Sequence, residues 1–329
     1  MLMKRRSVLA GGAALAALAV VRPSYATGTG NIFVSTEKGN EVVVLDPKYN
    51  IIKRIATSKR PRDMQITRAH DKLYVACGDD DAIDVIDMTK LDVIDSIPTG
   101  PSPEMFRLSD DEKSVYVSDE QNSTVEKIDI TQKIATQTIP SGAEPEGILI
   151  MPGGKMAFAT SEVADMVHVI DTEKGAVIKN ILVGTRPRRF ILTPDLGELW
   201  VSCELSSEIF IIDTKTHEIK GDSLIIIPPG FQVQDVTPVG MAITKDGTKV
   251  LLTLGRANHI AIIDAHTHAV LAFVLTGSRP WSVDLSRDEK TAIVANGLSD
   301  DITVVDMTTM QPVQSYPIGR IPHTVVIDD

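Results

Sequence analysis

Short runs of alternating apolar and polar residues, separated by turn residues, fill the chain from residue 31 to residue 328. After a loop proline come two apolar positions with one residue between them, as at Phe190 and Leu192, and then a turn such as TPDLGE. A second apolar run, a loop rich in Asp, Glu, Asn and Gly, and two further runs lead to the next proline. Runs of this length, with period-two alternation and turn residues between them, predict four β-strands in each unit.

Two independent markers show that this unit recurs seven times. A marker aspartate closes the third run of each unit, at Asp46, Asp87, Asp129, Asp171, Asp213, Asp264 and Asp306. The loop proline occurs at Pro61, Pro103, Pro145, Pro187, Pro238, Pro280 and Pro322. The intervals are 41, 42, 42, 42, 51 and 42 residues for the aspartates and 42, 42, 42, 51, 42 and 42 for the prolines. A four-stranded repeat of about 40–45 residues is the size of a propeller blade. The sequence therefore predicts an all-β fold, a seven-bladed β-propeller of four-stranded antiparallel blades.

The two ends of the repeat region indicate how the ring closes. The region begins with NIFVS, which matches the second strand of a unit, and ends with TVVIDD, which matches a first strand. We expect the C-terminal strand to pair with the N-terminal blade, because closure removes exposed sheet edges.

The second strands carry a family resemblance. LYVAC (73–77), VYVSD (115–119), AFATS (157–161) and LWVSC (199–203) resemble the YVTN-type β-propeller repeat, and the resemblance covers essentially all of residues 31–328. We expect their aromatic residues to pack between neighbouring blades, at Phe33, Tyr74, Tyr116, Phe158 and Trp200. The chain most closely resembles the β-propeller proteins associated with PQQ-dependent catabolism. That resemblance implies a place in the periplasm beside quinoprotein alcohol oxidation and transport systems, with no established catalytic residues.

The N-terminus is typical of an exported protein. Residues 1–26 have a basic start at Lys4, Arg5 and Arg6, an apolar run, and a small-residue cleavage site, which together predict a signal peptide and a mature domain of residues 27–329. Both the twin-arginine route and general secretion remain open, and either predicts a periplasmic protein. Residues 1–26 hold four basic and no acidic residues, so the remainder has 29 basic against 44 acidic residues and a net charge of −15. Such a surface disfavours nucleic acid. No later run predicts a membrane span, and we expect a monomer.

The loop prolines point to a candidate site. GTRPRRF (184–190) is one of seven proline loops, which the propeller should gather on one face around the central channel. We interpret the Gly-x-x-Pro frame as structural, with glycine for the turn and proline to fix φ, and we expect the neighbouring positions to bind a ligand or partner. The candidate binding residues are Arg62, Glu104, Glu146, Arg186, Arg188, Arg189, Trp281 and His323. Weaker candidates for a hard cation, from loops that should open on the same face, are Glu37, Glu120, Glu162 and Glu204. The alternative is a solvated loop surface whose charges pair locally.

Other motifs favour no chemistry. The letters GDSL at 221–224 match a hydrolase signature, but Ser223 lies in the insertion of an all-β repeat, so we do not expect catalysis there. His266 and His268 in DAHTH should lie on the opposite face, without a visible third metal ligand. Cys77 and Cys203 occupy one register in blades three apart, which predicts free thiols. No CxxCH occurs, so no c-type haem is expected.

Three functions therefore stay open. The first is a non-catalytic periplasmic binding or scaffolding protein, linked to PQQ-dependent alcohol oxidation or a transport system and contacting a periplasmic protein or small ligand with its proline-loop face. The second is a carrier of a metal or cofactor, such as a hard cation or a haem-like group. The third is a lactonase-like hydrolase. The sequence itself requires no cofactor.

Overall fold

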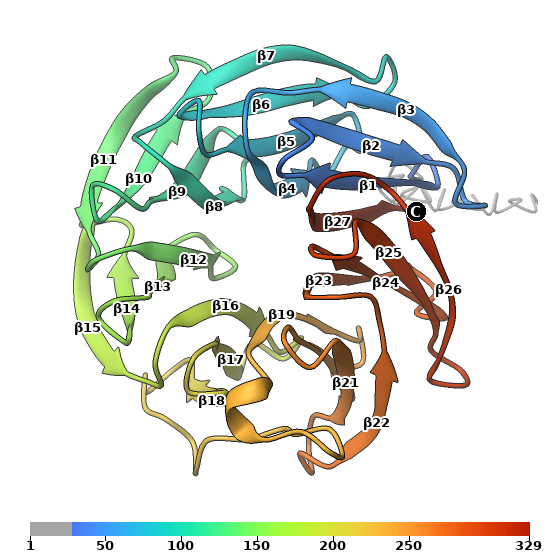
Figure 1. The fold of residues 1–329 in the computed structure, drawn as a ribbon. Coiled ribbons are helices and arrows are strands. Elements are labelled where there is room, and N and C mark those ends of the chain that lie inside the picture. The colour runs from blue at the N-terminus through green and yellow to red at the C-terminus, as the bar shows by residue number, and fades with distance from the viewer. Residues whose placement is uncertain (1–27) are drawn as a thin grey trace, which may run out of the picture.

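The computed structural model describes residues 28–329, so the predicted signal peptide at 1–26 and residue 27 lie outside the described residues. The described residues contain 27 strands in seven antiparallel sheets, arranged as blades around a central axis (Figure 1). This arrangement confirms the predicted all-β, seven-bladed β-propeller. Among residues 28–329, no helix is long and apolar enough to cross a membrane.

Each blade runs from an inner strand beside the central axis to an outer strand at the periphery. Blade 1 contains, in that order, β27 (Pro322–Asp328), β1 (Asn31–Thr36), β2 (Glu41–Leu45) and β3 (Ile51–Ala56). Blade 2 contains β4 (Pro61–Ile66), β5 (Lys72–Cys77), β6 (Ala82–Asp87) and β7 (Asp92–Pro98). Blade 3 contains β8 (Pro103–Leu108), β9 (Ser114–Asp119), β10 (Thr124–Asp129) and β11 (Ile134–Pro140). Blade 4 contains β12 (Pro145–Ile150), β13 (Met156–Ser161), β14 (Met166–Asp171) and β15 (Ala176–Leu182). Blade 5 contains β16 (Pro187–Leu192), β17 (Glu198–Cys203) and β18 (Glu208–Asp213). Blade 6 contains β19 (Pro238–Ile243), β20 (Lys249–Leu254), β21 (His259–Asp264) and β22 (Val270–Leu275). Blade 7 contains β23 (Pro280–Leu285), β24 (Thr291–Asn296), β25 (Asp301–Asp306) and β26 (Gln311–Pro317).

The C-terminal strand closes the ring, as the sequence predicts. β27 pairs antiparallel with β1, with Ile327 opposite Ile32 and Val325 opposite Val34. Asp328 fastens this junction, because its carboxylate accepts hydrogen bonds from the backbone N–H (2.7 Å) and hydroxyl (2.6 Å) of Thr29. The inner strands then follow one another around the full circle, each beside the inner strand of the next blade.

The hydrophobic core is divided among the spaces between blades. Seven buried clusters occupy these spaces, one for each pair of neighbouring blades. Each aromatic residue of the second strands is buried in such a cluster together with residues of the next blade, which confirms its predicted packing role; these are Phe33, Tyr74, Tyr116, Phe158 and Trp200. Cys77 and Cys203 are free and buried in two of these clusters. The blades are therefore held side by side by apolar contact.

The marker aspartates all act in the same way. Each side chain lies at the end of a third strand and accepts hydrogen bonds from backbone N–H groups of the turn that follows, as Asp264 does from His266 (3.1 Å) and Thr267 (2.8 Å). The same contact recurs at Asp46, Asp87, Asp129, Asp171, Asp213 and Asp306. An aspartate suits this turn because its short side chain reaches the backbone two or three residues ahead.

Blade 5 departs from the four-stranded prediction, since it has three strands. The inserted segment replaces the fourth strand and pairs with β18 only through two isolated bridges, Ile212 with Ile219 and Ile209 with Leu224. Pro228 and Pro229 follow, and neither can donate a backbone hydrogen bond. The segment ends in a short 3₁₀ helix, η1 (Val233–Asp235), which leads into the loop of Pro238.

Candidate functional site

The proline loops and the loops between second and third strands meet on one face, as predicted. In every blade the residue before the proline accepts a hydrogen bond from the residue that follows a second strand. Examples are the Glu37 N–H to the Ile321 carbonyl (2.8 Å) and the Glu204 N–H to the Arg186 carbonyl (2.9 Å). The pre-proline residue has a left-handed φ in each loop, between 52° and 60°. The seven loops therefore share one backbone geometry, and their side chains decide how the loops differ.

The glycines of the Gly-x-x-Pro frame serve in two ways. Gly142 and Gly319 have a positive φ, of 79° and 153°, which fits the predicted turn role. At Gly100, Gly184 and Gly277 the backbone is not left-handed. A Cβ would instead come within 1.8 Å of the Asp119 carboxylate at Gly100 and within 2.2 Å of the Ser206 hydroxyl at Gly184. These glycines give room for close approach, while the pre-proline residue makes the left-handed turn.

Four residues just after the prolines, together with two glutamates that follow second strands, form a buried charged layer across the inner end of this face. We define the charged layer as Arg62, Glu104, Glu146, Glu162, Arg188 and Glu204, all of which are buried. Arg62 pairs with Glu104, and Arg188 contacts Glu146 (3.1 Å), Glu162 and Glu204 (3.7 Å). The predicted charge pairing is present, but these side chains are not part of a solvated surface. The contacts of Arg62 with Glu104 and of Arg188 with Glu146 and Glu162 join neighbouring blades, because the ring brings the loops of adjacent blades together.

Four side chains lie above this layer and remain partly open to solvent. We call Arg60, Arg186, Arg279 and Trp281 the rim. Each rim arginine is held by a glutamate: Arg60 by Glu104 (2.8 Å), Arg186 by Glu162 (2.7 Å), and Arg279 by Glu204 (2.5 Å). The Arg279 guanidinium also lies over the Trp281 ring, 4.7 Å from its centroid. The rim is thus an arginine-rich surface with one aromatic side chain, fixed from beneath.

Glycine occurs where a rim side chain covers the neighbouring loop. After the second strand, four blades have glutamate (Glu37, Glu120, Glu162 and Glu204) and three have glycine (Gly78, Gly255 and Gly297). At Gly297 a Cβ would come within 2.2 Å of the Trp281 indole nitrogen, and at Gly78 within 2.8 Å of the Arg60 guanidinium. The absence of a side chain at these positions allows the rim residues to lie against the backbone.

The charges shift the pKa values of several acids. Burial raises the pKa of Glu104 to about 8 and that of Glu162 to about 7. Burial acts in the same direction on Glu146, but the charges of Arg188, Arg62 and Arg189 outweigh it and lower the pKa of Glu146 to about 2. Glu146 is therefore the most firmly ionised of these three carboxyl groups at neutral pH.

His323 lies beside the charged layer as a neutral imidazole. Burial, together with Arg62 and Arg189, lowers its pKa well below the ordinary value. Its Nε2 accepts a hydrogen bond from Arg62 Nε at 3.1 Å, and its Nδ1 lies 3.0 Å from the Thr324 hydroxyl. Trp281 stacks on the ring at a centroid distance of 5.9 Å. The imidazole is thus held by arginines rather than turned toward solvent.

The hard-cation candidates face arginine or hydroxyl groups. Glu162 and Glu204 bind rim arginines, Glu37 lies 3.5 Å from Arg60, and Glu120 accepts a hydrogen bond from Ser102 at 2.8 Å. Within residues 28–329, no group of three or more His, Cys, Asp or Glu side chains is arranged to hold a metal ion. The metal assignment at these glutamates stays a prediction.

The inner strands also line a cavity of about 220 Å³ that sequence reasoning missed. Its polar lining includes Asp63, Arg107, Arg189, Ser282 and Asp284, and its apolar lining includes three methionines, Met64, Met105 and Met241. Burial raises the pKa of Asp284 to about 6. Asp63 and Asp284 are charged residues inside otherwise apolar inner strands, and this pattern could have indicated the cavity from the sequence.

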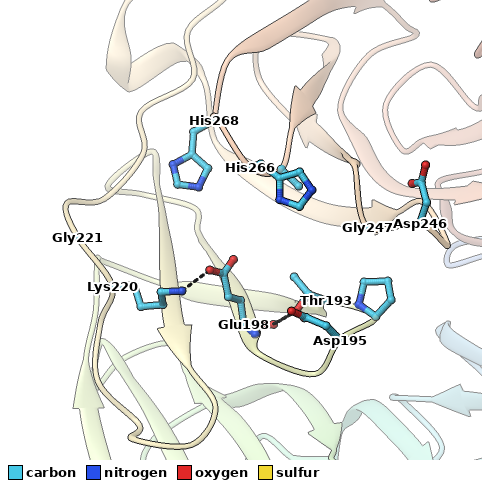
Figure 2. Close-up of a pocket in the computed structure, with 11 residues that line it drawn as sticks. Thr193, Asp195, Glu198, Lys220, Gly221, Asp246, Gly247, His266 and His268 are labelled. Atoms are coloured by element: carbon cyan, nitrogen blue, oxygen red, sulfur yellow. Dashed lines mark hydrogen bonds and ion pairs between the residues drawn. The ribbon is translucent and has the colours of Figure 1, made fainter.

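A larger hollow of about 510 Å³ lies on the opposite face, between blades 5 and 6 (Figure 2). His266 and His268 line it, as does the Lys220–Glu198 ion pair (2.5 Å). The hollow adjoins the inserted segment at Gly221. Nearby, Ser223 of the GDSL motif donates a hydrogen bond to Glu208 at 2.6 Å, and no histidine is among its hydrogen-bond partners. Among the described residues, the motif therefore lacks the serine–histidine pair of such hydrolases.

The fold and these loops define the class of protein, a seven-bladed β-propeller with a charged channel entrance. A sequence model of the YNCE-like β-propeller family matches residues 27–190. No curated protein matches the chain.

Solved structures with the same fold cover almost the whole propeller. The Kuenenia stuttgartiensis hydrazine synthase is 22% identical with a TM-score of 0.76, over 89% of this chain and 99% of that one. The Pseudomonas aeruginosa periplasmic gluconolactonase PpgL is 18% identical with a TM-score of 0.75, over 91% and 99%. The dihydro-heme d1 dehydrogenase NirN is 14% identical with a TM-score of 0.68, over 93% and 77%. At these identities the likeness shows the fold alone.

Proposed function

We propose that this chain is an exported, non-catalytic β-propeller whose rim binds a periplasmic protein or a small ligand carrying carboxylate or phosphate groups. The observation that carries the proposal is the rim itself, three arginines held by buried glutamates and one tryptophan packed against Arg279. Arginine and tryptophan dominate binding surfaces because they combine apolar area with directed hydrogen bonds. Holding them in place before binding lowers the entropy that a partner must overcome.

The cellular setting is also part of the proposal. The sequence of residues 1–26 supports export to the periplasm, and the repeat resemblance supports a link to PQQ-dependent alcohol oxidation or a connected transport system. The chain after residue 26 has a net charge of −15, so the arginine-rich rim differs from the otherwise acidic protein around it.

A lactonase-like hydrolase is the second candidate, since PpgL shares the fold and its name describes a gluconolactonase. Hydrolysis needs a general base within reach of substrate. His323 is 1% exposed, and its Nε2 already accepts a hydrogen bond from Arg62. Binding therefore fits the geometry better than hydrolysis.

Paired photo-crosslinking tests the proposal. A photoreactive amino acid at the position of Arg186 in the rim, and a matched one at His266 on the opposite face, would be expressed in the native host. We expect a discrete crosslinked partner from position 186 and none from position 266. Crosslinks from position 266 alone would contradict the rim assignment. Hydrolysis of gluconolactone by the purified protein above the uncatalysed rate would contradict the non-catalytic role.

A further inference from the structure

Arg189 is a buried cation without an anionic partner. Its side chain is 6% exposed, and no carboxylate of residues 28–329 lies within 4.0 Å of it. Its Nε has no hydrogen-bond partner, and its Nη2 has only a long contact of 3.4 Å to His323 Nε2. Burial lowers the pKa of Arg189 to about 10, so the guanidinium is still protonated at neutral pH.

The carboxylates closest to this charge are already used by other arginines. Glu146 contacts Arg188 at 3.1 Å, and Asp63 binds Arg107 at 2.7 Å. Arg62 and Arg188 add further positive charge, which acts against a second unpaired cation. A buried charge is costly unless it is paired and hydrogen-bonded. An anion bound next to Arg189 would therefore stabilise the folded protein.

Arg189 is one of the residues that line the channel cavity of about 220 Å³. A cavity of this size has room for several water molecules or one small organic molecule. The charged layer lies on the proline-loop side of the cavity, so we expect a ligand to enter from the other end of the channel, where Arg107 and Asp284 line it.

We propose that this cavity binds a small organic monocarboxylate, with the carboxylate on Arg189 and the apolar part against the methionines. The chemistry of the lining selects this class. One unpaired guanidinium matches one negative charge and can bind two carboxylate oxygens with its planar fork. Asp63 and Asp284 in the same lining disfavour a doubly charged phosphate. Met64, Met105 and Met241 offer an adaptable apolar wall.

This site is separate from the rim and does not rest on the proposed function. Failure of the rim to bind a partner would leave the monocarboxylate site intact, and the reverse also holds. The two sites lie on opposite sides of the charged layer, so variants of Arg189 and variants of the rim can be read independently.

The test uses propionate as the probe, with phosphate and chloride at matched ionic strength. In thermal unfolding of the parent protein, we expect the melting temperature to rise with propionate by roughly 2–4 °C for each tenfold increase above the dissociation constant. Phosphate should give a smaller rise than propionate. Arg189→Met should abolish the rise, and in chloride alone it should melt at least as high as the parent, because an uncompensated charge has been removed.

Two further variants keep the test decisive. Arg189→Lys retains the charge without the fork, so its affinity for propionate by titration calorimetry should fall at least tenfold. Arg320→Met, which changes an exposed arginine, should keep the parent response. A parent protein that responds equally to propionate and chloride would overturn the proposal. An Arg189→Met or Arg189→Lys protein that binds propionate as tightly as the parent would also overturn it.

Discussion

The two faces of this propeller differ in how far their residues repeat from blade to blade. At the turns after the third strands, all seven positions hold aspartate, and all seven side chains accept hydrogen bonds from the turn backbone. At the positions just after the prolines, the preceding residue has the same left-handed φ in every blade, but the residues are Arg62, Glu104, Glu146, Arg188, Val239, Trp281 and His323. The first set repeats one residue, and the second uses five residue types.

The difference lies in what each side chain must satisfy. A marker aspartate serves its own turn, so every blade needs the same residue. A post-proline residue meets its neighbours from other blades at the channel, so the choice in one blade depends on the choice in the next. Arg62 faces Glu104 of the following blade, and Arg188 faces Glu146 of the preceding one. The proline-loop face is therefore the one on which the blades differ from each other.

The largest expected effect comes from breaking the ring that creates both faces. Deletion of residues 321–329 removes β27, which pairs along β1 and buries Val325. Edges would be exposed on both sides of the gap, and we expect a loss of several kcal/mol, a large part of typical stability. Chemical denaturation of the purified protein measures this. A truncated protein that unfolds at the same denaturant concentration as the parent would contradict closure.

Removing one member of the charged layer should have the next largest effect. Arg188 is 3% exposed and contacts three glutamates, so Arg188→Ala should cost about 3–5 kcal/mol by leaving buried carboxylates unpaired. Arg68→Ala is the matched control. Arg68 has an exposed ion pair with Asp110 at 3.5 Å, so its loss should cost under about 1 kcal/mol in the same denaturation experiment.

A third prediction concerns Asp284, which lines the channel cavity, and the pH dependence of stability. The pKa of Asp284 is raised to about 6 from an ordinary value of 3.8, with burial as the main cause and Asp329 adding to it. The folded state therefore binds this proton more tightly than the unfolded state. Its stabilising contribution is complete below about pH 4 and is lost as the pH rises through about 6. Asp284→Asn should remove this part of the decline, measured as the free energy of unfolding from about pH 4 to about pH 7. An unchanged profile would contradict the assigned shift.

The smallest effects should come from the marker aspartates, and their additivity tests the comparison itself. Asp87 and Asp264 belong to separate turns in blades 2 and 6, so the effects of Asp87→Ala and Asp264→Ala on unfolding should add. Arg188 and Glu204 contact each other at 3.7 Å, so a double-mutant cycle for this pair should show coupling of at least about 0.5 kcal/mol. Coupling between the two aspartates, or none between Arg188 and Glu204, would remove the distinction between the faces.

Periodic features of the fold could be predicted from the sequence. The common period of Asp and Pro fixes seven blades, and the unmatched strand at each end predicts ring closure, which the β1–β27 pairing confirms. The aromatic residues of the second strands follow the same logic, because a position that repeats in every blade has the same surroundings in every blade. The missing fourth strand of blade 5 lies in the one segment where the period is interrupted.

The candidate site could be predicted only as a set of positions. The period places the post-proline residues on one face, but it does not predict which of their side chains contact each other or which are buried. The burial of Arg188 depends on glutamates from three loops, and the placement of Trp281 depends on the glycine at position 297. Arg189 differs from Arg188 by one position in the sequence, yet Arg188 is surrounded by carboxylates and Arg189 has none within 4.0 Å among residues 28–329. Such differences arise from the packing of several blades at once.

The central claim is that the rim, and not the opposite face, is the binding surface. Its most direct test is the affinity of three proteins for the partner recovered by crosslinking: the parent, an Arg186→Ala and Trp281→Ala double variant, and His266→Ala on the opposite face. Both rim side chains are partly open to solvent, so the double variant should keep the fold. We expect it to bind more weakly by over about 2 kcal/mol, which is roughly 30-fold, and His266→Ala to bind as the parent does. Weakened binding by His266→Ala, with the rim variant unchanged, would contradict the account.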